Sequence, residues 1–211
     1  MQEIINMKPL RNLYIAIVIP STGRIVAPLI MRLIKWGKMG AEINIVAGAF
    51  LDVARNMAVR QFLKSKKQYF LFIDSDTIPE NVDDLKKLMK HKKDIIGGLY
   101  NCVLSKDDGA MTTRPSAYSM IFDSRTLIDA VAVQKNTGLQ KVIGMGTGYM
   151  MVKREIFEKI PEPWFEFKWA DDKHIAFQGE DIGFCEKVIT QGFKLYCDTN
   201  CTALHVKEIM L

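Results

Sequence analysis

The chain has 211 residues, of which 48% are hydrophobic and 25% are charged, and these values suit one compact globular domain. Its formal net charge of +5 is mild and no long Lys/Arg tract occurs, so a dedicated nucleic-acid binder is not indicated. No stretch reaches the roughly 18 apolar residues of a membrane span, and residues 1–20 lack the pattern of a signal peptide. Four cysteines without a CxxC pair favour free thiols, and we therefore expect a cytoplasmic protein without a membrane segment.

The first hundred residues alternate short apolar strands with helices of 3.6-residue periodicity. Strands are expected at Ile15–Ile19, Ile43–Ala47, Tyr69–Ile73 and Asp94–Tyr100, and helices at Ile25–Trp36, Phe50–Lys64 and Asn81–Lys90. The second helix is expected to place one apolar row together, namely Phe50, Ala54, Met57, Ala58 and Phe62. This alternation predicts an α/β fold with a mostly parallel central sheet flanked by helices.

Ligands of such sheets bind beyond the carboxyl ends of the strands. We therefore expect the loop after Ile19, the turn after Ile73 and the segment after Tyr100 to meet at one edge of the sheet.

The second half of the chain has a different pattern. The polar stretch Asn101–Pro115 indicates a mobile loop. Strands are expected at Ala117–Asp123, Gln140–Met145, Tyr149–Val152 and Lys194–Cys197, and helices at Glu155–Ile160 and Asp181–Gln191. No internal repeat or low-complexity tract interrupts the chain, and we expect a single domain over residues 1–211.

Two carboxylates follow the strand Tyr69–Ile73, whose five apolar residues indicate burial on both faces. Asp74 and Asp76 are two residues apart, so an extended backbone directs both side chains to the same side. Two such carboxylates repel each other, and a divalent cation removes that cost, with Mg²⁺ and Mn²⁺ suited to hard oxygen ligands. A polar turn that uses Asp and Ser as turn formers is the alternative.

Asp74-Ser75-Asp76 resembles the DxD element of GT-A nucleotide-sugar glycosyltransferases, and Gly179-Glu180-Asp181 resembles their second signature, an acidic pair that opens a helix. Ala54-Arg55-Asn56, Gly146-Thr147-Gly148 and a lone His205 after the last strand are typical of family-2-like members. The resemblance spans nearly the whole chain. It implies a GT-A, Rossmann-like fold with a nucleotide-binding half over about residues 13–100 and an acceptor-side half over about 101–211.

The resemblance also implies a metal site. Asp76 is expected as a direct ligand, Asp74 as a ligand through water or as a partner of the ribose, and His205 as a further ligand. Mn²⁺ is favoured over Mg²⁺ if His205 binds, because imidazole suits Mn²⁺ better. An ordinary surface or core histidine is the alternative for His205.

The nucleoside and diphosphate are expected, again by resemblance, beside Pro20, Ser21, Thr22, Arg24, Arg55 and Asn56. Proline shapes the turn, hydroxyls bond base or ribose, and arginine meets phosphate with two parallel hydrogen bonds. A solvated helix face is the alternative for Arg55 and Asn56. Gly148 and its neighbours would let the backbone pass close to the donor sugar or the acceptor, unless they form a plain β-turn.

The second acidic pair opens a helix, where the helix dipole favours negative charge, so helix capping alone explains one carboxylate. In inverting members the acid after the glutamate takes the proton of the acceptor, which assigns the general base to Asp181 and acceptor positioning to Glu180, although the two roles can be exchanged. Trp164, Phe165 and Trp169 either stack against a sugar ring or form a lid of the core.

The expected activity is therefore metal-dependent transfer of a sugar from a nucleotide-diphosphate sugar to a hydroxyl of a glycan, protein or modified nucleic acid. The acid pair Glu180-Asp181 favours inversion, and a retaining enzyme, which needs no such base, is the alternative. A haloacid-dehalogenase-like phosphatase is one alternative, but Ile78 stands where that family has Thr or Val. A nucleotidyltransferase is another, but Pro20–Arg24 contains one Gly and one Arg where a richer loop is expected. A lectin-like binding module would have no need of a general base.

Overall fold

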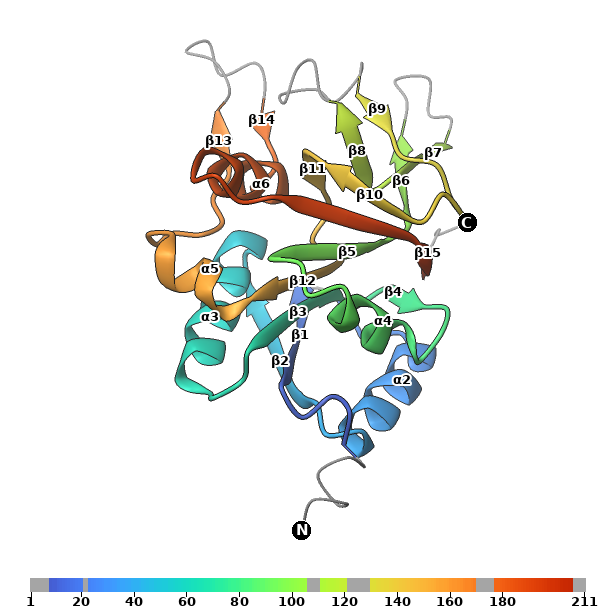
Figure 1. Ribbon diagram of the computed structural model, residues 1–211, viewed down its shortest axis with the longest axis vertical. Helices are drawn as coiled ribbons and strands as arrows, with labels where there is room; N and C mark the ends of the chain where they lie inside the picture. Colours follow the sequence, from blue (N-terminus) through green and yellow to red (C-terminus); the bar gives the residue numbers. More distant parts are fainter. Residues whose placement is uncertain (1–7, 21–22, 106–110, 121–129, 170–176, 207–211) are drawn as a thin grey trace.

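The computed structural model describes residues 8–20, 23–105, 111–120, 130–169 and 177–206. Its centre is an eight-stranded sheet (Figure 1), in which β4 pairs with β15 and the other strands follow the order β10-β15-β5-β12-β3-β1-β2. The strands of this sheet are β1 (Leu13–Pro20), β2 (Glu42–Ala49), β3 (Tyr69–Asp74), β4 (Thr77–Pro79), β5 (Ile95–Leu99), β10 (Leu139–Val142), β12 (Tyr149–Lys153) and β15 (Leu195–His205).

Strands from both halves of the chain alternate in this sheet. β1 is parallel to β2 and β3, and β5 is parallel to β15. β12 lies between β3 and β5 and is antiparallel to both. Because all residues from Tyr149 to Val152 are buried, β12 can occupy a central position with both faces covered. The four strands expected in the first hundred residues are confirmed, and β12 separates the third of them from the fourth.

Helices cover both faces of the sheet. Phe70 and Phe72 of β3 face α3 (Leu51–Lys64), α5 (Arg154–Lys159) and α6 (Glu180–Thr190), while Leu71 and Ile73 face α2 (Ala27–Lys38) and α4 (Asp84–Lys90). The two groups of helices lie on opposite sides of the sheet in Figure 1. None of the helices in the described ranges combines the length and apolar content that a bilayer crossing requires.

Helix α3 buries a narrower row than the sequence predicts. Ala54, Ala58 and Phe62 are fully buried, as expected. Phe50 is 84% exposed and Met57 is 37% exposed, so the expectation that both share the buried face is wrong. Among the described strands the central sheet ends at β2, which packs against α3.

Residues 101–115 contain a hairpin rather than the expected mobile loop. β6 (Asn101–Ser105) pairs antiparallel with β7 (Met111–Pro115). Backbone hydrogen bonds between the two strands order these residues, and such bonds do not depend on a particular side-chain pattern. The expected strand Gln140–Met145 is also divided, because β10 joins the central sheet and β11 (Gly144–Met145) joins a separate sheet with β8 (Ala117–Met120) and β9 (Val131–Ala132). A further pair consists of β13 (Lys168–Trp169) and β14 (Phe177–Gln178).

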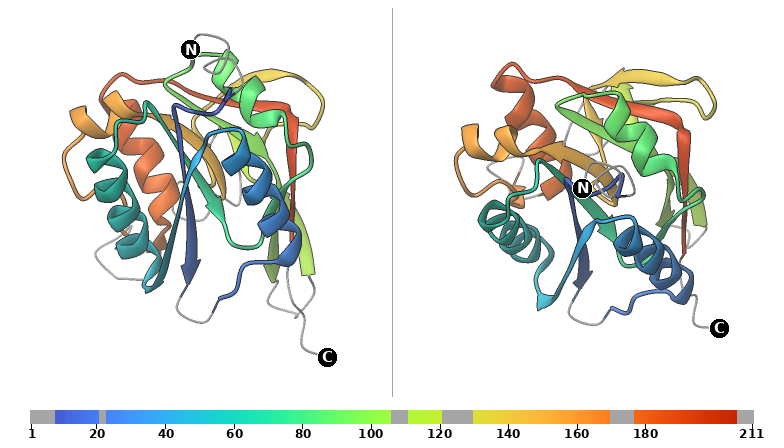
Figure 2. Two further views of the ribbon diagram at one scale, coloured as in Figure 1. Left: turned by 90° about the horizontal axis from the view of Figure 1, so that it is seen from below. Right: turned by 60° about the horizontal axis from the view of Figure 1, so that its bottom comes forward.

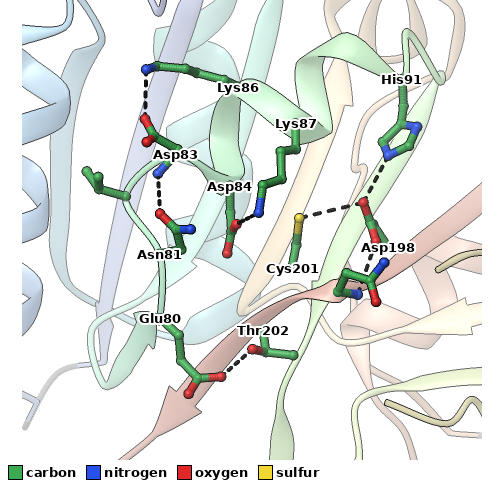
Figure 3. Close-up of polar contacts among 12 residues, drawn as sticks. Glu80, Asn81, Asp83, Asp84, Lys86, Lys87, His91, Asp198, Cys201 and Thr202 are labelled. Atoms are coloured by element: carbon green, nitrogen blue, oxygen red, sulfur yellow. Dashed lines mark hydrogen bonds and ion pairs between the residues drawn. The ribbon is translucent and has the colours of Figure 1, made fainter. Parts of the chain in front are cut away.

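β15 is eleven residues long and changes partners along its length, whereas the sequence predicts a short strand. Its register against β5 shifts between Asp198 and Thr202, and its end pairs with β4, where His205 lies opposite Thr77. Asp198 stabilises the shift, because its carboxylate accepts a hydrogen bond from the Asn200 backbone N–H and lies 2.9 Å from Nε2 of His91. Figure 3 shows these polar contacts between β15 and the segment that carries α4.

Two glycines that differ in their surroundings test the packing of this sheet. A methyl group at Gly98 would overlap the ring of Tyr149 and lie 2.5 Å from the carbonyl oxygen of Cys201, whereas a methyl group at Gly37 would lie 3.5 Å from Cδ1 of Ile43. We predict that Gly98→Ala lowers the free energy of unfolding by about 1–3 kcal/mol through overpacking. The matched Gly37→Ala, within helix α2, raises it by about 0.5–1 kcal/mol. Urea denaturation measures both, and an unchanged midpoint in Gly98→Ala contradicts the packing described.

Candidate active site

The two predicted acidic pairs meet in one cleft. A cavity of about 310 Å³, within the usual range for ligand sites, opens at the carboxyl ends of β1 and β3 and at the first turn of α6. It is lined by both pairs, Asp74 with Asp76 and Glu180 with Asp181, and also by Arg55 and His205. The turn after Ile73 and the segment after Tyr100 therefore reach the same edge of the sheet, as the sequence predicts.

Arg55 connects the two acidic pairs. Its Nη2 lies 3.2 Å from Oδ1 of Asp74, and its Nε lies 2.8 Å from Oε1 of Glu180. Burial by itself lowers the pKa of Arg55, but the two carboxylates outweigh this effect and raise the pKa above its ordinary value, so the side chain stays charged. Its buried Nη1 has no hydrogen-bond partner among the described residues, and it is a donor that the cleft can offer to an anionic ligand.

Glu180 and Asp181 have different surroundings although they are adjacent. Glu180 is 4% exposed and paired with Arg55, whereas Asp181 is partly exposed and its Oδ1 accepts a hydrogen bond of 2.8 Å from the N–H of Ile182. Loss of hydration, followed by the negative charges of Glu180 and Asp74, raises the pKa of Asp181 to about 7, although the Ile182 N–H and Arg55 oppose this rise. A carboxylate with such a pKa exchanges its proton near neutral pH, as a general base must.

His205 adjoins the second carboxylate of the DxD sequence. Its Nε2 lies 3.2 Å from Oδ2 of Asp76, and its Nδ1 lies 3.1 Å from the carbonyl oxygen of Asn101. Because a carbonyl only accepts hydrogen bonds, Nδ1 carries a hydrogen, and Nε2 faces the carboxylate of Asp76. An imidazole nitrogen and a carboxylate oxygen are both common metal ligands, so these two neighbouring residues fit a metal ion.

Asp74, the third expected metal ligand, is paired with Arg55. One oxygen of Asp74 pairs with Arg55, and no group of three or more His, Cys, Asp or Glu side chains in the described residues is arranged to hold a metal ion. The expected set of Asp74, Asp76 and His205 is therefore not gathered into one cluster, because Arg55 engages Asp74.

Asn56 lies outside the lining of the cleft, although the sequence places it beside the nucleotide. Its side chain is buried, with Nδ2 donating to the carbonyl of Phe165 and Oδ1 accepting from the N–H groups of Trp164 and Phe165. Both of these aromatic side chains are buried in the core, which favours the core alternative over sugar stacking. Asn56 thus fixes the segment that covers this part of the core. The side chain of Trp169 lies outside the described residues.

The expected nucleoside loop is described only in part. Pro20 ends β1, but its side chain and the residues Ser21 and Thr22 lie outside the described parts of the chain. Arg24 is exposed and does not belong to the cleft lining as the structure describes it.

The glycines around Thr147 permit close contacts between side chains. A methyl group at Gly148 would lie 2.8 Å from both Oδ2 of Asp74 and the hydroxyl of Tyr100, and this hydroxyl accepts a hydrogen bond of 3.1 Å from the Gly148 N–H. Burial raises the pKa of Tyr100 well above its ordinary value, so the phenol remains neutral. Glycine at this position therefore lets the backbone approach the carboxylate and the phenol.

Sequence reasoning missed several residues that line the cleft, among them Tyr100 and Thr147. Tyr100 ends a strand at the same sheet edge as Asp74, a signal that was available in the sequence. Thr147 is 1% exposed, and its Oγ1 has no hydrogen-bond partner among the described residues. Two flanking glycines marked its position, but only the structure shows its hydroxyl buried at the cleft.

Comparisons with known proteins identify the architecture. No family model and no curated protein sequence matches the chain. The crystal structure of A197 from STIV is similar to it, with a TM-score of 0.63 and 25% identity over 92% of this chain and 86% of that chain. The structure of GalNAc-T7 with UDP, GalNAc and Mn²⁺ is similar to it with a TM-score of 0.58 and 14% identity, over 95% of this chain and 44% of that chain. These similarities confirm the predicted fold class, a GT-A-like α/β domain with a mostly parallel central sheet.

Proposed function

We propose that the chain is a metal-dependent glycosyltransferase that moves a sugar from a nucleotide-diphosphate sugar to an acceptor hydroxyl with inversion. One observation carries this proposal: Arg55 joins Asp74 to Glu180, and the other member of each acidic pair, Asp76 or Asp181, lines the same cleft. The cleft thus contains a set of residues suited to a cation and a separate carboxylate suited to a proton. The GalNAc-T7 structure, which has a similar fold, contains UDP, GalNAc and Mn²⁺ and so supports the proposal.

Asp76 and His205 are the residues proposed to hold the divalent cation. When bound, the cation offsets the negative charge of the departing diphosphate. Ions of this kind commonly take one or two protein carboxylates and complete their coordination with phosphate oxygens and water, so two adjacent protein ligands are sufficient. The imidazole favours Mn²⁺. Asp74, which is held by Arg55, is proposed to contact the ribose or a water molecule of the metal.

Asp181 is proposed to accept the proton of the acceptor hydroxyl. Glu180 is buried against Arg55, so we assign it the positioning of Arg55 instead of direct contact with the acceptor. Nη1 of Arg55 and Oγ1 of Thr147 are buried polar atoms at the cleft without protein partners in the described residues, and substrate oxygens would satisfy both. The donor is proposed to occupy the half over about residues 13–100 and the acceptor, a glycan, protein or modified nucleic acid, the half over about 101–211.

We predict that a nucleoside diphosphate raises the melting temperature of the wild-type protein with Mn²⁺ and not with chelator. A ligand at a hundred times its Kd stabilises the folded state by about 2.7 kcal/mol, and Asp76→Ala should lose most of this gain. Asp83→Ala, which removes an exposed carboxylate on the segment before α4, is the matched control and should keep it. Thermal shift with a panel of nucleoside diphosphates measures the effect and identifies the donor nucleotide.

Two outcomes of that panel contradict the proposal. An equal shift in Asp76→Ala and wild type would remove Asp76 from the metal site. Stabilisation by nucleoside triphosphates alone would favour a nucleotidyltransferase, and stabilisation by phosphate mimics alone would favour a phosphatase.

We predict that Asp181→Asn lowers kcat for sugar transfer by about 10²–10⁴-fold, the usual contribution of a general base. Donor binding should remain, because the amide has nearly the same shape as the carboxylate. Wild-type kcat/KM should rise with pH up to about 7, where Asp181 loses its proton. Steady-state transfer assays with the donor identified above measure both effects, and wild-type turnover in Asp181→Asn would place the base elsewhere.

Asp181 also makes the stability of the metal-free protein depend on pH. Its pKa rises from the ordinary value of 3.8 to about 7 on folding, so the protonated group stabilises the fold below pH 3.8 and this contribution is lost as the pH rises through about 7. We predict that the free energy of unfolding of wild type falls relative to that of Asp181→Asn as the pH is raised from 4 to 8, because only the wild type has a carboxyl group that loses its proton there. Urea denaturation with chelator at several pH values measures the difference, and parallel pH profiles of the two proteins contradict the raised pKa.

A further inference from the structure

The end of the central sheet exposes an unprotected strand. In the part of the chain that the structure describes, β2 is the last strand and pairs with β1 alone, so the backbone groups along its other side have no strand partner. Soluble proteins commonly protect such an edge with Lys, Pro or inward-pointing charges. β2 reads Glu-Ile-Asn-Ile-Val-Ala-Gly-Ala, with one charge at its first residue.

Helix α2 presents apolar side chains beside this edge. A methyl group at Gly37 would lie 3.5 Å from Cδ1 of Ile43, which places Gly37 next to β2. Residues three, four and seven positions apart share a helix face, so Ile30 and Ile34 continue the row of Gly37. Their exposed fractions are 44% and 48%, and that of Ile45 on β2 is 52%.

Helix α3 also presents apolar side chains beside β2, on the other face of the sheet. A hydrogen bond between Asn44 and Gln61 turns the Gln61 side of α3 toward β2. Phe50, Val53 and Met57 precede Gln61 along this side, and they are 84%, 45% and 37% exposed. The left view of Figure 2 shows β2 flanked by α3 and α2.

We propose that this surface, which consists of β2 with the exposed rows of α2 and α3, binds a second copy of the chain. The two β2 strands pair antiparallel across a two-fold axis perpendicular to the sheet and join two eight-stranded sheets into one. Such an axis brings α2 against its own copy on one face and α3 against its own copy on the other, so each apolar row meets an identical apolar row.

Three properties of the surface favour a second copy as the occupant. The free edge of β2 offers N–H and C=O groups that an identical antiparallel strand can pair with. The exposed residues Ile30, Ile34, Phe50, Val53 and Met57 of these rows are uncharged, and depletion of charge is typical of interface centres, while Lys38 and Lys64 continue the rows at their ends. The strand β2 has eight residues and is about 27 Å long, and the exposed rows of α2 and α3 widen this surface on both faces of the sheet toward the ~800 Å² per partner of a stable interface.

The oligomeric state in solution tests this proposal independently of the proposed function. Light scattering coupled to size exclusion, from micromolar to submillimolar concentration, should give twice the mass of one chain for the wild type. Ile45→Arg places two like charges close to the axis and should raise the Kd of the dimer at least about tenfold, a change of about 1.4 kcal/mol. The matched control Val131→Arg, on β9 at 48% exposure, should remain dimeric.

Further variants and a second measurement keep the test decisive. Ile34→Arg and Val53→Arg change exposed helix positions on the same surface, and they replace Ile45→Arg if that chain does not fold. Hydrogen exchange should show backbone amides of β2 that become more protected as the protein concentration rises. A wild-type chain that stays monomeric at every concentration, or variants of this surface that dimerise as well as Val131→Arg, would overturn the proposal.

Discussion

The buried guanidinium of Arg55 lies between Asp74 at the end of β3 and Glu180 at the start of α6, and the geometry of the cleft depends on these two ion pairs. Removing one partner of such a buried pair typically costs about 3–5 kcal/mol, because an uncompensated charge remains. The same pairs connect the consecutive elements α3 and β3 to α6, which is far from both in the sequence. They also keep the two acidic pairs at a fixed separation, which a reaction between a bound donor and an acceptor requires.

The chain reaches this arrangement by placing strands of its second half within the sheet of its first half. β12 separates β3 from β5 and carries Gly148 beside Asp74, while the shift in β15 turns the end of that strand toward β4 and brings His205 to Asp76. Residues from both halves therefore surround one cleft. Nearly all of them lie on strands of the central sheet, on α3 and α6 and on the short turns between elements, which favours a preformed site over one assembled by a mobile loop.

The sequence allowed prediction of the features that local chemistry dictates. The continuous apolar run of β3 indicated burial on both faces, and the carboxylates after it indicated the site, because charged groups rarely end a buried strand without a role. The sequence did not reveal the features that depend on contacts between residues far apart in the chain. Asn56 resembles a ligand-binding residue until the buried backbone of Trp164 and Phe165 is known, and Met57 resembles a core residue until β2 is known to be the last strand. The hairpin of β6 and β7 depends on backbone pairing, which polar side chains do not reveal.

In each acidic pair, the two carboxylates have different partners. One member, Asp74 or Glu180, pairs with Arg55, and the other, Asp76 or Asp181, lines the cleft in different surroundings. Arg55 offsets the charge of the paired members, so four carboxylates can share a small volume without all of them becoming protonated. The remaining two then acquire different properties. Asp76 lies beside an imidazole and so remains suited to a cation, whereas the poorly hydrated Asp181 has a pKa raised to about 7 and is suited to a proton. A single buried arginine thus allows the proposed cation site and the proposed general base to lie within one cleft.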